Sequence, residues 1–248
     1  MIKKMLLIFT LLMLLSGCVF QENTTEYQQL SNQFEQYQMH DIIDDFQFEA
    51  LLEHVTYQAT ISALKIEIRV YTALGFLIET RFSSGFIFAQ NQDFYYVMTD
   101  LLTTEVNEPY ELWIEITDYK NETYRGYVVS RSETLGLSAI RFSKNPLKTL
   151  ELPNFSQTMP FTGEPVVMIG YVNRTLNGVR MGLVTGYETS SNLNTIMNTS
   201  IPTDHFANGS LILNIHAQVI GIQFDFSNGV ARAYDINTIQ MMIKDIII

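Results

Sequence analysis

The chain has 248 residues, of which 47% are hydrophobic, and its formal net charge is −11 at pH 7. This length allows one or two domains with a sizeable core, and the apolar content excludes a wholly disordered chain. The negative charge argues against nucleic acid as a partner, and the single Cys excludes an internal disulfide.

The chain begins with the pattern of a secretory signal. Lys3 and Lys4 precede an apolar run over residues 5–15, which is too short to cross a bilayer core of about 30 Å as a helix. The sequence Leu-Ser-Gly-Cys that ends at Cys18 resembles the lipobox of bacterial lipoproteins, in which the Cys receives a diacylglycerol and becomes the N-terminus. This resemblance implies a signal peptide over residues 1–17 and a lipid on Cys18 that anchors the protein to the extracytoplasmic face of the cell membrane. The alternative is an ordinary signal peptide in which a Cys occurs by chance.

A polar tether is expected after the anchor and a globular part after the tether. Residues 18–45 are rich in Gln, Asn, Glu and Asp, whereas residues 46–248 contain regularly spaced apolar positions. Ile66, Ile68 and Val70 alternate with charged residues, as a half-buried strand requires, and residues 112–116 repeat the pattern. Further short strands are predicted over residues 76–82, 85–89, 95–99, 124–130, 137–142, 165–171, 179–185, 210–214 and 218–225.

Gly, Asn and Asp separate these strands, which is typical of an all-β sandwich or a pair of barrels. The end of the chain has a different period. Its apolar side chains recur at the spacing of one helix face, and Asp235 or Asn237 is expected to cap that helix at its N-terminus. The residues on the apolar face are Ile239, Met242, Ile243 and Ile246.

Several segments, taken in chain order, resemble trypsin-like serine proteases of the bacterial HtrA type. They are Ser-Ser-Gly-Phe-Ile-Phe at residues 83–88, Tyr-Tyr-Val-Met-Thr-Asp-Leu-Leu at 95–102, Leu-Gly-Leu-Ser-Ala-Ile at 135–140, Gly-Glu-Pro-Val-Val-Met-Ile-Gly-Tyr at 163–171, Gly-Leu-Val-Thr at 182–185, Thr-Asp at 203–204, Ala-Asn-Gly-Ser-Leu at 207–211, Gln-Val-Ile-Gly-Ile at 218–222 and Asp-Ile-Asn-Thr-Ile at 235–239. The resemblance implies an all-β fold of two six-stranded antiparallel barrels with a cleft between them and a short C-terminal helix. Barrel one is expected over about residues 60–145, barrel two over about 146–232 and the helix over about 236–247.

The positions that match the family's catalytic triad hold residues that lack its chemistry. Leu102 stands at the position of the His that acts as base, Gly136 at that of the Asp and Asn208 at that of the nucleophilic Ser. A Leu has no lone pair, a Gly has no side chain, and an amide nitrogen is a poor nucleophile. Phe206 replaces the Gly that lies two residues before the nucleophile, which also puts the oxyanion hole in question. We therefore expect the catalytic site to be vacant.

A relocated catalytic set is the alternative, with Ser210 as nucleophile and His205 as its base beside Asp204. Neighbouring residues of an extended segment point to opposite sides, which disfavours a relay from Asp204 to His205. No Cys/His spacing and no Gly-rich phosphate loop indicates a metal or a cofactor.

Three functions remain open at this point. The first is a pseudoprotease that binds an extended peptide or unfolded protein in the cleft between the barrels, or serves as a scaffold. The second is an active serine endopeptidase that uses the relocated set. The third is a structural surface lipoprotein in which the barrels are only a stable platform.

Overall fold

The computed structural model describes residues 55, 57, 60–105, 109–147, 149–190 and 194–246. Cys18, the signal over residues 1–17 and the tether over residues 18–45 lie outside the described residues. Within the part of the chain that is described, no helix is both long enough and apolar enough to cross a bilayer.

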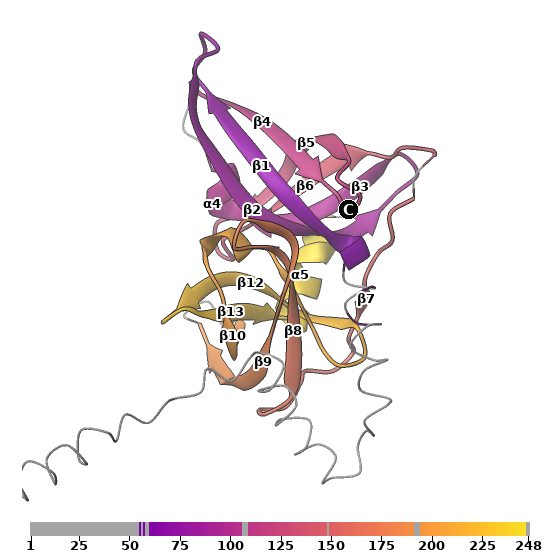
Figure 1. Ribbon diagram of the computed structural model, residues 1–248, viewed down its shortest axis with the longest axis vertical. Helices are drawn as coiled ribbons and strands as arrows, with labels where there is room; N and C mark the ends of the chain where they lie inside the picture. Colours follow the sequence, from indigo (N-terminus) through magenta and orange to yellow (C-terminus); the bar gives the residue numbers. More distant parts are fainter. Residues whose placement is uncertain are drawn as a thin grey trace, which may run out of the picture. The chain divides into compact units, whose positions relative to one another are not determined.

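Six antiparallel strands form barrel one (Figure 1). They are β1 (Ala63–Tyr71), β2 (Leu77–Gln90), β3 (Phe94–Asp100), β4 (Glu111–Thr117), β5 (Thr123–Ser132) and β6 (Leu137–Ser143), with the short helix α4 (Leu101–Thr104) after β3. Their order around the barrel is β1-β2-β3-β6-β5-β4, and pairing of β4 with β1 closes it. The alternating sequence of β1 places Ile66, Ile68 and Val70 inside, where they are fully or almost fully buried.

Barrel two is formed by β8 (Pro165–Val172), β9 (Thr175–Thr189), β10 (Thr195–Pro202), β11 (Leu211–Leu213), β12 (Gln218–Ser227) and β13 (Val230–Asp235). These strands run in the order β11-β8-β9-β10-β13-β12, and the pairing of β11 with β12 closes the ring. The two-residue strand β7 (Asn154–Phe155) adds to β12 in parallel, and α5 (Ile236–Ile246) follows β13. Two six-stranded antiparallel barrels with a short C-terminal helix confirm the predicted fold class.

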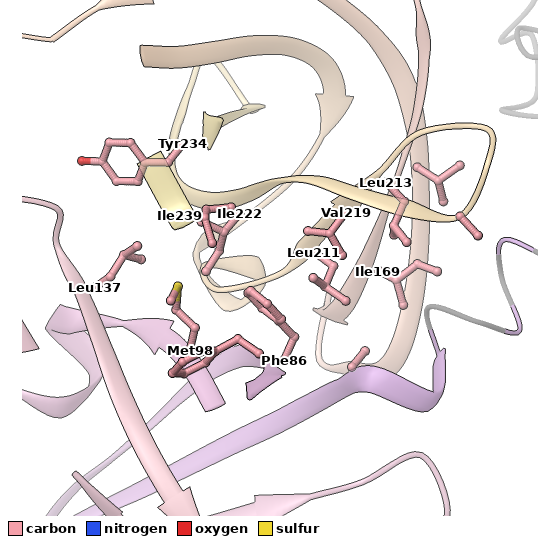
Figure 2. Packing of buried hydrophobic residues seen from close by; sticks show 14 of the residues in the cluster. Phe86, Met98, Leu137, Ile169, Leu211, Leu213, Val219, Ile222, Tyr234 and Ile239 are labelled. Carbon is pink, nitrogen blue, oxygen red and sulfur yellow. The ribbon is translucent and has the colours of Figure 1, made fainter. Parts of the chain in front are cut away.

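The largest apolar cluster joins the two barrels and α5. Phe86 and Met98 of barrel one pack in the same cluster as Leu211 and Ile222 of barrel two and Ile239 of α5 (Figure 2). Each barrel also has a core of its own. Because residues of both barrels pack together in this cluster, it holds the barrels against each other at the junction where the candidate site lies.

The strand predictions need correction in two respects. The segments expected as separate strands over residues 76–82 and 85–89 belong to one strand, β2, and three strands, β7, β10 and β13, are absent from the prediction. Asp235 caps α5, since its Oδ1 accepts a hydrogen bond from Thr238 N at 3.0 Å, so the first of the two proposed caps is the one used.

Candidate functional site

Two of the three positions matched to the catalytic triad are tied together at one end of barrel one. Leu102 lies in α4, and Gly136 lies in the turn before β6 with a φ of 63°. The backbone N–H of Leu101, next to Leu102, donates to Gly136 O at 2.8 Å. The fold therefore brings Leu102 and Gly136 into neighbouring positions.

The third position, Asn208, comes from barrel two and is held against barrel one. It belongs to the connection between β10 and β11, here called the 203–210 loop for its residues. Asn208 O accepts from Ser84 N at 2.8 Å and from Ser83 Oγ at 3.0 Å. The 203–210 loop is thus hydrogen-bonded directly to β2, more than a hundred residues earlier in the chain.

Gly209 permits this contact. Its φ is +87°, and a Cβ atom at this position would lie only 2.1 Å from Ser84 O. A side chain would therefore meet both an unfavourable backbone conformation and the backbone of β2. The Gly is required where the loop touches barrel one.

Beneath the loop lies a network of buried hydroxyl groups. Ser84 Oγ accepts from Tyr171 N at 2.7 Å and from Ser210 Oγ at 2.8 Å, and it donates to Phe206 O at 3.2 Å. Thr99 Oγ1 donates to Ser84 O at 2.6 Å. Ser210, the predicted alternative nucleophile, is fully buried in this network, so its hydroxyl is engaged in joining the barrels.

The loop itself is wound into the 3-10 turn η1 (His205–Ala207). Asp204 caps this turn, because its Oδ1 accepts from Phe206 N at 2.8 Å, while its Oδ2 accepts from Asn173 N at 3.0 Å. Asn208 N donates back to His205 O at 3.5 Å, a long hydrogen bond that closes the turn. The N–H groups of Phe206 and Asn208 therefore both point at acceptors of their own loop.

The side chain of Asn208 is also fixed. Its Oδ1 accepts from Gln223 Nε2 at 3.1 Å, and Gln223 is fully buried. Gln223 Oε1 in turn accepts from Thr203 Oγ1 at 3.0 Å, while Gly209 N donates to Gln223 O at 2.7 Å. Gln223 thus provides hydrogen-bond partners for Thr203, Asn208 and Gly209 of the loop, through both its side chain and its backbone.

An aromatic cluster covers the same turn. The rings of Phe82, Tyr171 and Phe206 lie 5.9–6.5 Å apart, from centroid to centroid. Lys65 Nζ lies 5.1 Å from the Phe82 centroid, and the Arg174 guanidinium lies 5.1 Å from that of Phe206. The Phe206 side chain is therefore held by barrel one and by the β8–β9 hairpin, which fixes the turn further.

The predicted couple of Ser210 and His205 is not brought together. The Ser210 hydroxyl donates to Ser84 Oγ, whereas His205 is exposed and its ring lies 3.9 Å from that of Phe206. Asp204 directs both carboxylate oxygens to backbone N–H groups. No group of three or more His, Cys, Asp or Glu suited to a metal ion is found among the residues that the structure describes.

Sequence reasoning missed the buried network of Ser84, Thr99 and Gln223 and the aromatic cluster around Phe206. The pairs Ser83-Ser84 and Thr203-Asp204 were noticed only as parts of a resemblance. Their hydrogen-bond partners lie far away in the sequence, and a polar residue in a strand pattern gives no signal of where its partner is.

A comparison with known families supplies one match. The sequence model described as a trypsin-like peptidase domain matches residues 83–222, which is more than half of the chain. This range contains the 203–210 loop, α4 and the turn at Gly136. A comparison with curated proteins gave no match.

Proposed function

This chain belongs to the trypsin-like peptidase family, and we propose that it is a pseudoprotease, an HtrA-type member without proteolytic activity that works as a membrane-anchored binding or scaffold module. The observation that carries the proposal is the closed 203–210 loop. The backbone N–H groups of Phe206 and Asn208 in this loop already donate to acceptors of the loop itself.

The closed loop removes the stabilisation that peptide-bond cleavage requires. A trypsin-like peptidase stabilises the oxyanion with the backbone N–H of its nucleophile and that of the residue two positions earlier. Here the matched groups are Asn208 N and Phe206 N, which are engaged with His205 O and Asp204 Oδ1. Loss of one such donor costs on the order of 10²–10³ in kcat, so the engaged Phe206 N alone removes much of what the scaffold contributes, and the long hydrogen bond of Asn208 N acts in the same direction.

The matched triad positions support the same conclusion. Leu102, Gly136 and Asn208 offer no base, no orienting carboxylate and no nucleophilic hydroxyl. Asn208 Oδ1 is moreover held by Gln223 Nε2. In a serine protease, removal of the whole triad costs about 10⁶ in kcat. Combined with a closed oxyanion hole, the vacancy leaves no route to turnover at a useful rate.

The endopeptidase alternative requires the hydroxyl of Ser210 to reach a substrate. That hydroxyl is fully buried and donates to Ser84 Oγ, so access to it would require the two barrels to separate. The test is digestion of reduced casein by the wild-type chain and by Ser210→Ala. We expect no cleavage by either protein, whereas cleavage by the wild-type chain that Ser210→Ala abolishes would establish the endopeptidase.

A strand edge near the loop supports a peptide-binding role. Gln223 and residues 225–227 of β12 pair with β13 along one edge, while the pairing of β11 on the other edge ends at Ile222. Among the described strands, none pairs with residues 224–227 on that second edge. An extended peptide would add there as a further strand through backbone hydrogen bonds.

Hydrogen exchange tests this binding role against the platform alternative. Addition of reduced casein, or of extended peptides released from it, should increase the protection of amides in residues 224–227. Amides 72–76 in the loop between β1 and β2 serve as the control and should not change. No change in either segment would favour a structural platform over a binding module.

Membrane attachment rests on the sequence around Cys18. A lipid on this residue would hold an acidic protein at an anionic membrane surface that otherwise repels it. Intact mass of the chain purified from bacterial membranes tests the modification. A diacylglycerol adduct that disappears in Cys18→Ser is expected, and an unmodified Cys18 would contradict the anchor.

A further inference from the structure

The loop between β1 and β2 is apolar and exposed. Leu74, Phe76, Leu77 and Ile78 are 84%, 67%, 54% and 49% exposed. We call residues 71–78 the hairpin tip; in Figure 1 this tip lies at the top, beyond the ends of the other strands of barrel one. We propose that the hairpin tip inserts into the lipid bilayer to which the protein is anchored. The inference rests on the proposed membrane location for the presence of that bilayer.

The size of the tip argues against a protein partner. Its four exposed side chains present roughly 400–500 Å² of apolar surface. Each partner in a standard protein–protein interface buries about 800 Å². A second copy of the chain that met this one only through the tips would therefore bury too little surface for a stable dimer, whereas a bilayer needs no complementary surface.

The apolar side chains of the tip also follow one another along an irregular stretch of strand. Phe76, Leu77 and Ile78 are consecutive, and Ile78 is the extra residue of a β-bulge, because Tyr71 pairs with Leu77 whereas Val70 pairs with Glu79. All three side chains are about half exposed or more. A bilayer covers such neighbouring side chains without the fixed complementary shape that a groove on another protein would need.

The backbone of the tip is suited to an apolar medium, in which unpaired N–H and C=O groups are costly. Thr72 N donates to Phe76 O at 2.9 Å, Gly75 N donates to Thr72 O at 2.8 Å, and Phe76 N donates to Thr72 Oγ1 at 3.1 Å. The turn therefore satisfies three of its own donors without water.

Charged and aromatic residues mark where insertion would stop. No charged residue occurs between Arg69 and Glu79, and Val70 pairs with Glu79 across the hairpin. On the neighbouring strand β4, the exposed Glu111 pairs with Tyr71 at the base of the tip, and Trp113 pairs with Arg69, two residues further from the turn. Trp113 is 47% exposed and Tyr110, just before β4, is 42% exposed.

Trp and Tyr concentrate at the boundary between headgroups and acyl chains. From the level of Tyr71 and Glu111 to Leu74 in the turn, three extended residues span about 10 Å. That length agrees with the roughly 5–10 Å to which interfacial segments enter a bilayer. The charged side chains of Arg69, Glu79 and Glu111 would remain among the headgroups.

Trp113 is the only Trp of the chain, so it reports on this level without modification. The double variant Trp113→Phe/Phe76→Trp moves the reporter to the tip, and Trp113→Phe/Phe161→Trp moves it to a residue that is 59% exposed between β7 and β8. The full chain purified from membranes is reconstituted into phosphatidylcholine vesicles that carry bromine at defined acyl depths. We expect deep bromines to quench the tip reporter most, shallow bromines to quench Trp113, and neither to quench the Phe161→Trp reporter.

Charged substitutions in the tip test insertion further. Leu74→Glu and Leu77→Glu, combined in the tip-reporter chain, should lower the inserted population on the order of 100-fold, because each lost apolar side chain costs about tenfold. Leu147→Glu, at a residue that is 91% exposed outside the tip, should leave quenching unchanged. A second measurement uses a chain in which Trp113 is unchanged and a nitroxide label is attached to Leu74→Cys. If the tip is inserted, the label should be accessible to oxygen, which dissolves in the bilayer, and shielded from a water-soluble nickel chelate.

The possible results separate insertion from anchoring. Quenching of the tip in both the wild-type and Cys18→Ser backgrounds supports insertion and shows that the lipid is not required for it. Flotation with vesicles that depends on Cys18, together with a tip reporter no more quenched than the Phe161→Trp control, overturns insertion and leaves the anchor intact. A blue shift of the tip reporter that depends on protein concentration without vesicles also overturns it, because a second copy would then cover the tip.

Discussion

Replacing Gly209 with Ala should separate the two barrels at the point where the 203–210 loop meets β2. The new methyl group would lie 2.1 Å from Ser84 O and 3.2 Å from the Cα of Thr99. The backbone must shift to accept it, and the shift strains the hydrogen bond from Ser84 N to Asn208 O. Gly229→Ala is the matched control, because Gly229 has a similar φ of 77° but nothing within 4 Å of the added methyl.

The two substitutions share one energetic cost and differ in another. An L-residue in the left-handed conformation costs about 1–2 kcal/mol, and this applies to both positions. Forcing a methyl group into a packed junction costs a further ~1–3 kcal/mol. We therefore expect Gly229→Ala to lower the free energy of unfolding by about 1–2 kcal/mol and Gly209→Ala to lower it by about 2–5 kcal/mol.

Urea unfolding followed by circular dichroism measures both values, with the slope m compared to ensure that the unfolded states are equivalent. The difference between the two variants isolates the contact with Ser84. If Gly209→Ala and Gly229→Ala destabilise the protein equally, the 203–210 loop is not clamped against β2. The oxyanion site would then not be held closed by this contact.

Three further predictions concern packing and protonation. Phe86→Ala removes a fully buried ring from the cluster that joins the barrels and should lower the free energy of unfolding by about 3–5 kcal/mol in urea titrations. Burial raises the pKa of Glu164 above its ordinary value, so its contribution to stability is present at low pH and is lost as the pH rises through the folded-state pKa. Glu164→Gln should therefore be more stable than the wild-type chain at pH 7, with the gap closing below about pH 4 in thermal melts. Burial and the negative charges of Glu164 and Asp235 raise the pKa of Tyr187 to about 12. The wild-type chain should thus lose stability from about pH 10 towards pH 12, and Tyr187→Phe should lack that part of the loss.

The sequence predicts those strands in which one face is buried and the other is exposed. The alternation at Ile66, Ile68 and Val70 predicts a strand, and β1 is that strand, because successive side chains of a strand point to opposite faces. β10 escapes this reasoning because its pairing shifts between Asn198 and Thr199, and the irregularity moves the alternation out of phase. The apolar residues from Phe76 onwards predict an ordinary strand over residues 76–82, since nothing in the sequence distinguishes an exposed strand end from a buried one.

At the candidate site, the sequence predicts which residues occupy the matched positions but not the shape that they adopt. The closed turn depends on Asp204, which is local, and also on Ser84 and Gln223. The hydrogen bond from Ser210 to Ser84 spans 126 residues. Contacts of that separation follow from how the barrels meet, so they become visible only in three dimensions.

The central claim is that the family's scaffold persists here without a nucleophile that a substrate can reach. Reaction of the native chain with a fluorophosphonate, followed by intact mass, tests it most directly, because this reagent modifies only an activated hydroxyl. The account predicts that the mass stays unchanged after prolonged incubation. One phosphonyl group per chain, absent in Ser210→Ala, would contradict it.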